Sequence, residues 1–314
     1  MHIIASISPI FAVVILGYFT RKSGYISKDL LGSANRLVFY LAIPALIFRA
    51  VSTASFTTDF NSSVLVITLL STTSIYVFSW LLARRRRWSL ARIGSFVQCA
   101  GHGNHGFVGL PVALYCIGDS GLVKAAILAG FLFMLQNLLS VLALEVNGAD
   151  GGTRGVTIRK IGRSMLGNPI ILSAFAGMVV SWFEIGMPGP ALRFLDIMSG
   201  MAAPLSLLLI GASLSFTMMR KNFFSVVGVV IMKLVSLPLL GIVLFLMMGL
   251  SQDDYLPALI LLATPTATVA YVMAGEMGGD SEFAAAAIST STLASAVTYL
   301  LWLTIALYLK PFNL

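Results

Sequence analysis

Polar side chains that could bind an anion or exchange a proton stand inside two otherwise apolar segments of this 314-residue chain. The first segment reads CAGHGNHGFVGLPVALYCIGDS and contains His102, Asn104 and His105 among several glycines. An imidazole changes charge near neutral pH and an amide offers two N–H donors, so these residue types suit a carboxylate ligand. The second segment reads LLATPTATVAYVMAG, in which Pro265 stands among threonines and aliphatic residues.

These polar residues do not form a pattern typical of a catalytic site or a metal site. An intramembrane enzyme would need a pair of aspartates at membrane depth, a serine and histidine set, or a zinc motif such as H-E-x-x-H. Asp196 has no deep acidic partner, and His102 and His105 have no acidic neighbour. Cys99 and Cys116 lack further ligands, so we expect them to pack. We therefore expect no catalytic residue, no metal site and no cofactor.

The composition defines the environment of these residues. Hydrophobic residues make up 58% of the chain and charged residues only 10%, with a mean hydropathy of +0.94, whereas an average soluble domain carries about 25% charged residues. The apolar runs approach the ~20 residues that cross a bilayer as a helix, and none alternates as a membrane barrel requires. The sequence therefore predicts an all-α polytopic membrane protein. Ten apolar segments are expected, at about residues 3–19, 32–52, 62–83, 93–117, 121–145, 168–184, 190–215, 222–249, 255–276 and 282–309.

Basic residues predict the orientation of the chain. Lys and Arg gather in the loops after the first, third, fifth and seventh segments, represented by Arg21, Arg84, Arg154 and Arg220. Because basic loops stay on the cytoplasmic side, both termini are expected outside the cell inner (plasma) membrane. The first segment has its positive charges behind it, so we expect a retained span. The run RRRRW is interpreted as part of this topology signal, and no nucleic-acid partner is expected.

The two halves of the chain resemble each other at an offset near 160. SPI at Ser8 corresponds to NPI at Asn168, IPALIF at Ile43 to APLSLL at Ala203, and GDS at Gly118 to GDS at Gly279. These matches predict a first five-helix repeat in residues 1–145, a cytoplasmic hinge in residues 146–167 and a second repeat in residues 168–314. Because five is an odd number, the second copy enters the membrane from the opposite face, as in many secondary transporters.

Corresponding interruptions in the fourth and ninth segments indicate a binding site. Adding 161 to 104 gives 265, so Asn104 and Pro265 interrupt their segments at matching depths. Interrupted helices free backbone N–H groups at the positive end of a helix dipole, which suits an anion. The candidate binding residues are Gly103, Asn104, His105, Gly106, Pro265, Thr266, Thr268 and Asn35. Gly103 and Gly106 would let the two segments cross closely.

Three residues are candidates for coupling transport to protons. His102 and His105 could exchange a proton with a substrate carboxylate, or they could simply cap freed carbonyl groups. Lys233 lies deep in the eighth segment, where a buried charge points to function, although it could equally pair with a crossing-helix carbonyl. Few amides and no carboxylates gather at the crossing, which favours protons over sodium as the coupling ion.

Several motifs of the chain resemble those of the auxin efflux carrier family of membrane transporters. They are NRLVFYLAIPALIF, GNHGFVGLPVAL, APLSLLLIGASLS, KLVSLPLL, TPTATVAYVMAGEMGGD and STSTLASAVTYLLW. The resemblance covers nearly the whole chain and implies ten helices in two inverted repeats, with the fourth and ninth helices crossing as in bile acid/sodium symporters. It also implies organic anion substrates, auxin in plant members and small carboxylates such as malonate in bacterial ones. Plant members have a proline where this chain has His105, and a long central loop, which favours a small carboxylate over auxin.

The sequence therefore predicts a secondary active carrier that moves a small organic anion, a mono- or dicarboxylate, by alternating access in the lipid bilayer. A facilitative channel or uniporter for auxin-like weak acids is the main alternative, and an intramembrane enzyme is the least favoured. A homodimer is compatible with this architecture.

Overall fold

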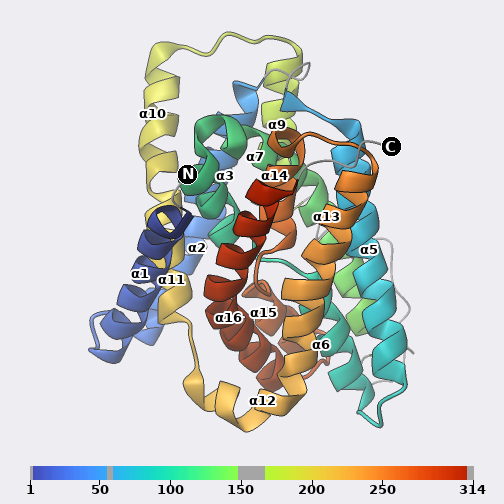
Figure 1. Ribbon diagram of the computed structural model, residues 1–314. Helices are drawn as coiled ribbons and strands as arrows, with labels where there is room; N and C mark the ends of the chain where they lie inside the picture. The colour runs from blue at the N-terminus through green and yellow to red at the C-terminus, as the bar shows by residue number, and fades with distance from the viewer. Residues whose placement is uncertain (1–2, 55–58, 148–166, 310–314) are drawn as a thin grey trace.

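The computed structural model describes residues 3–54, 59–147 and 167–309, which are almost entirely helical (Figure 1). The first half contains α1 (Ile3–Lys22), α2 (Lys28–Leu37), the π-helical turn η1 (Val38–Ala42), α3 (Ile43–Ser52), α5 (Ser62–Arg84), α6 (Leu90–Gly101), the π-helical turn η2 (His105–Gly109) and α7 (Leu110–Val146). The second half contains α9 (Pro169–Trp182), α10 (Gly189–Gly200), α11 (Ala202–Ala212), α12 (Phe216–Val230), the π-helical turn η3 (Ile231–Ser236), α13 (Leu237–Met247), α14 (Gln252–Leu262), α15 (Val269–Glu276) and α16 (Ser281–Tyr308). Within these ranges the chain forms no β-strand, and extended segments meet only in an isolated bridge between Gly103 and Thr266.

Seven helical stretches of the described chain are long and apolar enough to cross a membrane. They are Ile3–Lys22, Lys28–Ser52, Ser62–Arg84, His105–Val146, Gly189–Ala212, Ser225–Met247 and Ser281–Tyr308. The apolar helix α9 is shorter. The predicted segments 93–117 and 255–276 are each divided into two helical pieces by a non-helical stretch. This pattern is that of a polytopic membrane protein.

Side-chain caps explain where several helices begin. Ser27 accepts a hydrogen bond from the amide of Leu30 over 3.1 Å, so α2 begins four residues before the predicted segment at 32. Ser215 caps α12 in the same way, and this helix begins six residues before the predicted segment at 222. Arg220, which the sequence analysis places in a loop, therefore lies on α12. A capping oxygen satisfies one of the free N–H groups of the first turn.

The helix α7 contains one glycine that separates two predicted spans. Gly118 has a φ of 70° and a ψ of −167°, which interrupts the helical path between predicted segments 93–117 and 121–145. The predicted hinge at residues 146–167 lies almost wholly outside the described residues, together with Arg154.

Close backbone packing joins helices from the two halves of the chain. A Cβ at Gly17 of α1 would collide with the carbonyl of Leu208 on α11, and one at Gly211 would collide with the carbonyl of Val14. Small residues permit this approach, as is common between membrane helices. The helices α1, α2, α10 and α11 lie on one side of the bundle in Figure 1, while α5 and α13 lie on the other.

Candidate site at the crossing of two interrupted helices

Two non-helical segments pass each other in antiparallel directions inside the bundle. The amide of Asn104 donates to the carbonyl of Pro265 over 2.8 Å, and the amide of Ala267 donates to the carbonyl of His102 over 2.9 Å. Gly103 and Thr266 form the bridge between these bonds. Backbone groups freed where α6 ends and α15 begins thus satisfy one another, as buried backbone at membrane depth requires.

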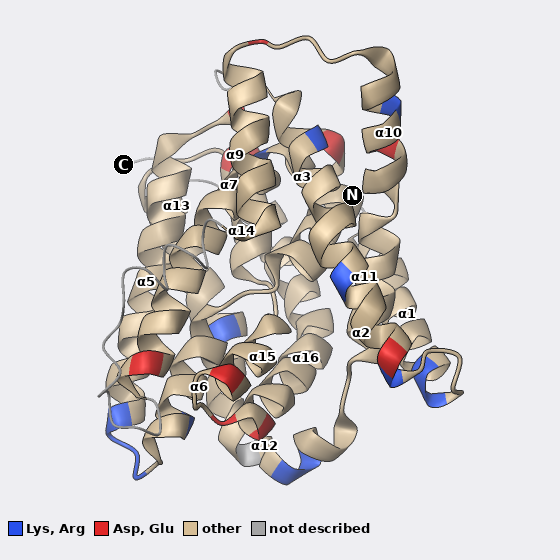
Figure 2. Cartoon of the chain, turned by 180° about the vertical axis from the view of Figure 1, so that it is seen from behind, with Lys and Arg blue, Asp and Glu red and all other residues tan. Residues whose placement is uncertain are grey.

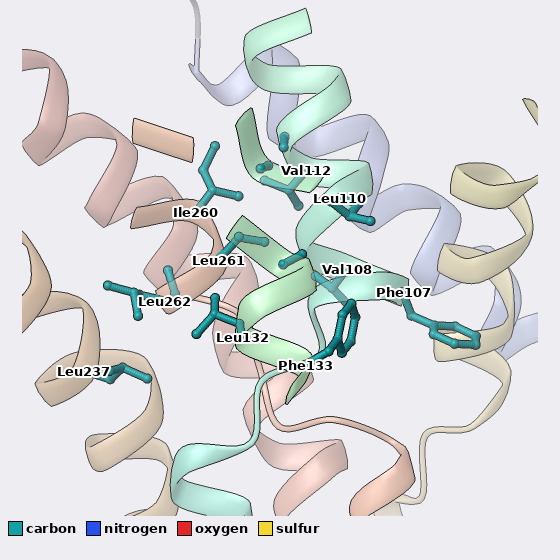
Figure 3. Packing of buried hydrophobic residues seen from close by; sticks show 14 of the residues in the cluster. Phe107, Val108, Leu110, Val112, Leu132, Phe133, Leu237, Ile260, Leu261 and Leu262 are labelled. Carbon is teal, nitrogen blue, oxygen red and sulfur yellow. The ribbon is translucent and has the colours of Figure 1, made fainter. Parts of the chain in front are cut away.

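Glycines make this close passage sterically feasible. A Cβ at Gly103 would lie 2.7 Å from Cε1 of His105 and 3.1 Å from Nζ of Lys233. A Cβ at Gly109 would lie 2.9 Å from the side chain of Leu261. The apolar side chains around the crossing, among them Leu261 and Phe133, are shown in Figure 3. The expected role of Gly103 in close approach agrees with this geometry, whereas Gly106 faces Ile43 and Phe133 instead of the second interrupted segment.

Neighbouring helices stabilise each interrupted segment through a side chain. Gln136 of α7 accepts from the amide of Gly103 and donates to the carbonyl of Gly101, each over 3.1 Å. Ser291 of α16 accepts from the amide of Thr266 over 3.1 Å. Gln136 and Ser291 are fully buried, so these bonds replace helical ones that the interruptions remove.

Thr264 connects the side chains of His105 and Lys233. Its hydroxyl donates to the carbonyl of Leu261 over 2.7 Å, so its oxygen acts as an acceptor toward its other neighbours. Nδ1 of His105 lies 3.3 Å from this oxygen, and Nζ of Lys233 lies 3.5 Å from it. The proton of a neutral His105 therefore belongs on Nδ1, which leaves a lone pair on Nε2.

The amine of Lys233 is fully buried and close to the end of a helix. Nζ donates to the carbonyl of Leu262 over 2.9 Å, at the C-terminal end of α14. That end of a helix is partially negative and favours a cation. Among the described residues no carboxylate lies within ion-pair distance of Lys233. Its partner is a backbone carbonyl group, which is one of the two alternatives that the sequence left open.

Two polar atoms at the crossing have no hydrogen-bond partner among the described residues. Oδ1 of Asn104 accepts from the amide of Phe107 over 3.3 Å, whereas Nδ2 of Asn104 is unpartnered. Nε2 of His105 is also unpartnered. Asn104 is 4% exposed and His105 is 0% exposed. A buried polar atom without a hydrogen bond destabilises the folded state. A ligand that forms hydrogen bonds with these two atoms would remove that cost.

His102 belongs to a different hydrogen-bonded group. Its Nδ1 lies 2.9 Å from the hydroxyl of Ser140, which lies 2.8 Å from the hydroxyl of Tyr76. These residues come from α5, α7 and the end of α6. The ring of His102 therefore ties three helices together, and its hydrogen bonds do not include Thr264 or Lys233.

Comparison with known proteins identifies the family. A family model described as membrane transport protein matches residues 2–150 and 152–303. The chain belongs to this family, the auxin efflux carriers. It is therefore a multi-pass membrane transporter, which agrees with its apolar helices.

Relatives of this transporter occur in bacteria and archaea. The chain is 29% identical over 300 residues to a Rhizobium meliloti protein named "Putative malonate transporter", with 92% of this chain and 91% of the relative covered. It is 26% identical over 296 residues to an uncharacterized transporter of Methanothermobacter thermautotrophicus, with 93% and 95% covered. The similarity thus extends over nearly the full length of each protein.

The structure of this auxin efflux carrier family member brings some of the predicted site residues together and not others. Gly103, Asn104, His105, Pro265 and Thr266 meet at the crossing, with Lys233 beside them. Gly106 lies in η2, Thr268 is half-buried at the start of α15, and Asn35 lies on α2, which packs against η1 and α11.

Sequence reasoning missed one residue at the centre of this transporter's candidate site. Thr264 links His105, Lys233 and Leu261, whereas the sequence-based candidates in the same motif are the later threonines, Thr266 and Thr268. Its position directly before Pro265, within an otherwise apolar run, was the available signal. The hydroxyl before a helix-interrupting proline is a natural partner for freed backbone carbonyls.

Proposed function

We propose that this transporter carries a small organic anion, a mono- or dicarboxylate, and binds it at the crossing of the two interrupted helices. One observation carries the proposal: the unpartnered Nδ2 of Asn104 and Nε2 of His105 stand on consecutive, buried residues at this crossing. The name of the Rhizobium meliloti relative, which mentions malonate, supports the same substrate class.

Charge around the crossing favours an anion. The buried amine of Lys233 has only neutral acceptors, Leu262 and Thr264, among the described residues. A buried ammonium group without a counter-ion is costly, and removing that cost favours any ligand that supplies a negative charge. A carboxylate would do so, whereas a cationic substrate would meet repulsion from Lys233.

The hydrogen bonds of His105 support coupling to protons. With its proton on Nδ1, a neutral His105 offers only a lone pair at Nε2, which cannot donate to a carboxylate. Adding a proton at Nε2 turns this atom into a donor toward the anion. We therefore propose that the anion and a proton bind together at His105, and that sodium is not required. His102 is the second candidate for coupling, but its ring bonds to Ser140.

We also propose the architecture of ten transmembrane helices in two inverted repeats, residues 1–145 and 168–314. Backbone conformation supports it. Gly118 and Gly278, which are 160 positions apart, have φ angles of 70° and 72°. Gly24 has a φ of 83°, and Glu184, also 160 positions on, has a φ of 50°. A residue such as glutamate seldom adopts a positive φ, so a shared backbone path accounts for this pair.

Helix contacts repeat at the same offset. Gly17 packs against the carbonyl of Leu208. The positions that correspond to these two residues at an offset of 160 are Gly177 and Phe48, and they also contact each other. A Cβ at Gly177 would lie 3.3 Å from the carbonyl oxygen of Phe48. Two copies that pack on each other in this reciprocal way support alternating access by movement around a fixed site.

The distribution of charge supports the proposed orientation. Lys and Arg gather at one end of the bundle in Figure 2. That end includes the last turn of α1, with Arg21 and Lys22. Basic ends remain on the cytoplasmic side, so we place this end in the cytoplasm, with both termini outside the inner membrane.

Ligand-induced stabilisation of the purified protein tests the proposed substrate class. Malonate and other small carboxylates should raise the melting temperature without sodium, because a ligand that binds only the folded state stabilises it. Uptake into proteoliposomes should saturate with substrate, as a carrier requires. If no small carboxylate stabilises a monodisperse preparation, the anion site is wrong. A flux that rises without saturation would identify a channel instead.

A further inference from the structure

A surface hollow lies away from the crossing, at the basic end of the bundle. It opens on the surface between α1 and the start of α12, and it is lined by Tyr18, Phe216, Thr217 and Arg220. Lys and Arg residues gather at this end of the molecule (Figure 2). The hollow shares no residue with the candidate substrate site.

The wall of the hollow is aromatic. The rings of Tyr18 and Phe216 meet edge to face, with centroids 5.0 Å apart and planes inclined by 70°. Tyr18 is half-buried and Phe216 is 40% exposed. Tyr and other aromatic rings concentrate where a membrane meets water, because the ring is apolar and the hydroxyl is not.

The hollow contains a cationic side chain without an ion-pair partner among the described residues. Arg220 is exposed, and among the described residues no carboxylate lies within ion-pair distance of it. Its neighbour Lys221 differs, because its amine pairs with Glu282. A guanidinium group matches the geometry of a phosphate and can bind it through two parallel hydrogen bonds. Thr217 adds a hydroxyl donor at the rim.

We propose that this hollow binds the headgroup phosphate of an anionic phospholipid from the cytoplasmic leaflet. Basic pockets between membrane helices on the cytoplasmic side are suited to such headgroups. Leu16 and Phe19 on α1 are 55% and 53% exposed and provide an apolar surface for an acyl chain. Arg21 and Lys22 at the end of α1 would repel the ammonium group of a zwitterionic headgroup, so an anionic lipid is favoured.

The position of the hollow gives the lipid a consequence for transport. Tyr18 belongs to the first half of the chain and Arg220 to the second. A lipid that contacts both residues stabilises the arrangement of α1 against α12 that the structure contains. The rate of transport should therefore depend on the content of anionic lipid, whichever substrate is carried.

The test uses the full chain in detergent, with phosphatidylglycerol as the probe. Phosphatidylglycerol should raise the melting temperature, whereas phosphatidylcholine and inorganic phosphate should not. Arg220→Gln should raise the half-saturating lipid concentration by at least about tenfold, since the loss of even one charged hydrogen bond has that effect. Lys221→Gln is the matched control and should respond as the unchanged protein does, because Lys221 already has Glu282 as a partner.

Native mass spectrometry provides a second measurement that does not depend on thermal unfolding. Arg220→Gln should retain fewer phosphatidylglycerol molecules than Lys221→Gln. The proposal is overturned if Arg220→Gln keeps both the full thermal shift and the full lipid count. It is also overturned if phosphatidylcholine stabilises the protein equally, since the recognition would then not involve the net charge. Stabilisation by inorganic phosphate alone would identify a soluble anion as the ligand and exclude the lipid.

Discussion

The amide of Asn104 donates to the carbonyl of Pro265 over 2.8 Å, and these two residues are 161 positions apart, close to the offset of 160 in the proposed repeat. The same antiparallel pairing brings Gly103 to Thr266 and His105 to Thr264. Residues from the two halves of the chain thus meet at the crossing. Their side chains differ, so the surroundings are asymmetric: amide and imidazole come from one half, and hydroxyls and Lys233 from the other.

Asn104→Asp should weaken anion binding while keeping the helix cap. Aspartate retains an oxygen that can accept from the amide of Phe107, as Oδ1 of Asn104 does over 3.3 Å. The free N–H donors are replaced by a carboxylate oxygen, so binding should fall by at least about 1–3 kcal/mol. Thermal shift with malonate and proteoliposome uptake would measure the loss. Asn137→Asp on α7 is the control, and an unchanged affinity in Asn104→Asp would place the site elsewhere.

Lys233→Met should abolish much of the anion-dependent stabilisation without unfolding the protein. A buried ammonium group without a counter-ion is costly to the folded state, and an apolar side chain of similar length removes that cost. We expect a ligand-free melting temperature equal to or above that of the unchanged protein, with a weaker response to carboxylates. Lys124→Met removes a cation that pairs with Asp254 at 3.5 Å and serves as the control. A full carboxylate response in Lys233→Met would show that this amine does not balance the anion.

Gln136→Leu should destabilise the crossing itself. The substitution leaves the amide of Gly103 and the carbonyl of Gly101 without their partner, at about 1–3 kcal/mol for each buried group. The melting temperature should fall even without ligand. Asn137→Leu removes a neighbouring amide whose hydrogen bond returns to its own helix, at Phe133, and should cost less. Equal losses in both variants would contradict a bridging role for Gln136.

His105→Gln should flatten the pH dependence of substrate affinity. If the anion binds together with a proton at Nε2, affinity falls as pH rises because the donor is lost. Glutamine offers an uncharged amide and does not titrate, so the pH dependence should disappear after correction for ionisation of the substrate. His102→Gln should keep the original profile, since His102 bonds to Ser140. A double variant that still shows the original profile would make both histidines structural.

Much of the fold could be predicted from local properties of the sequence. The length and apolarity of each segment depend only on neighbouring residues. Inside a membrane the backbone N–H and C=O groups of such a segment have no water to bind, so the segment forms a helix. The interruptions at Asn104 and Pro265 could be located because glycine and proline disfavour a helix wherever they occur. The first residues of α2 and α12 are harder to predict, because the caps Ser27 and Ser215 are polar residues outside the apolar run.

The sequence by itself determined that polar residues interrupt two matched spans, but only the tertiary structure decided what each one contacts. His102 and His105 are three positions apart and of one residue type, yet one bonds to Ser140 and the other lies by Thr264, 159 positions away. Lys233 meets the carbonyl of Leu262 because α14 ends beside η3. Partners so distant along the chain are selected by helix packing, which leaves no periodic trace in the sequence.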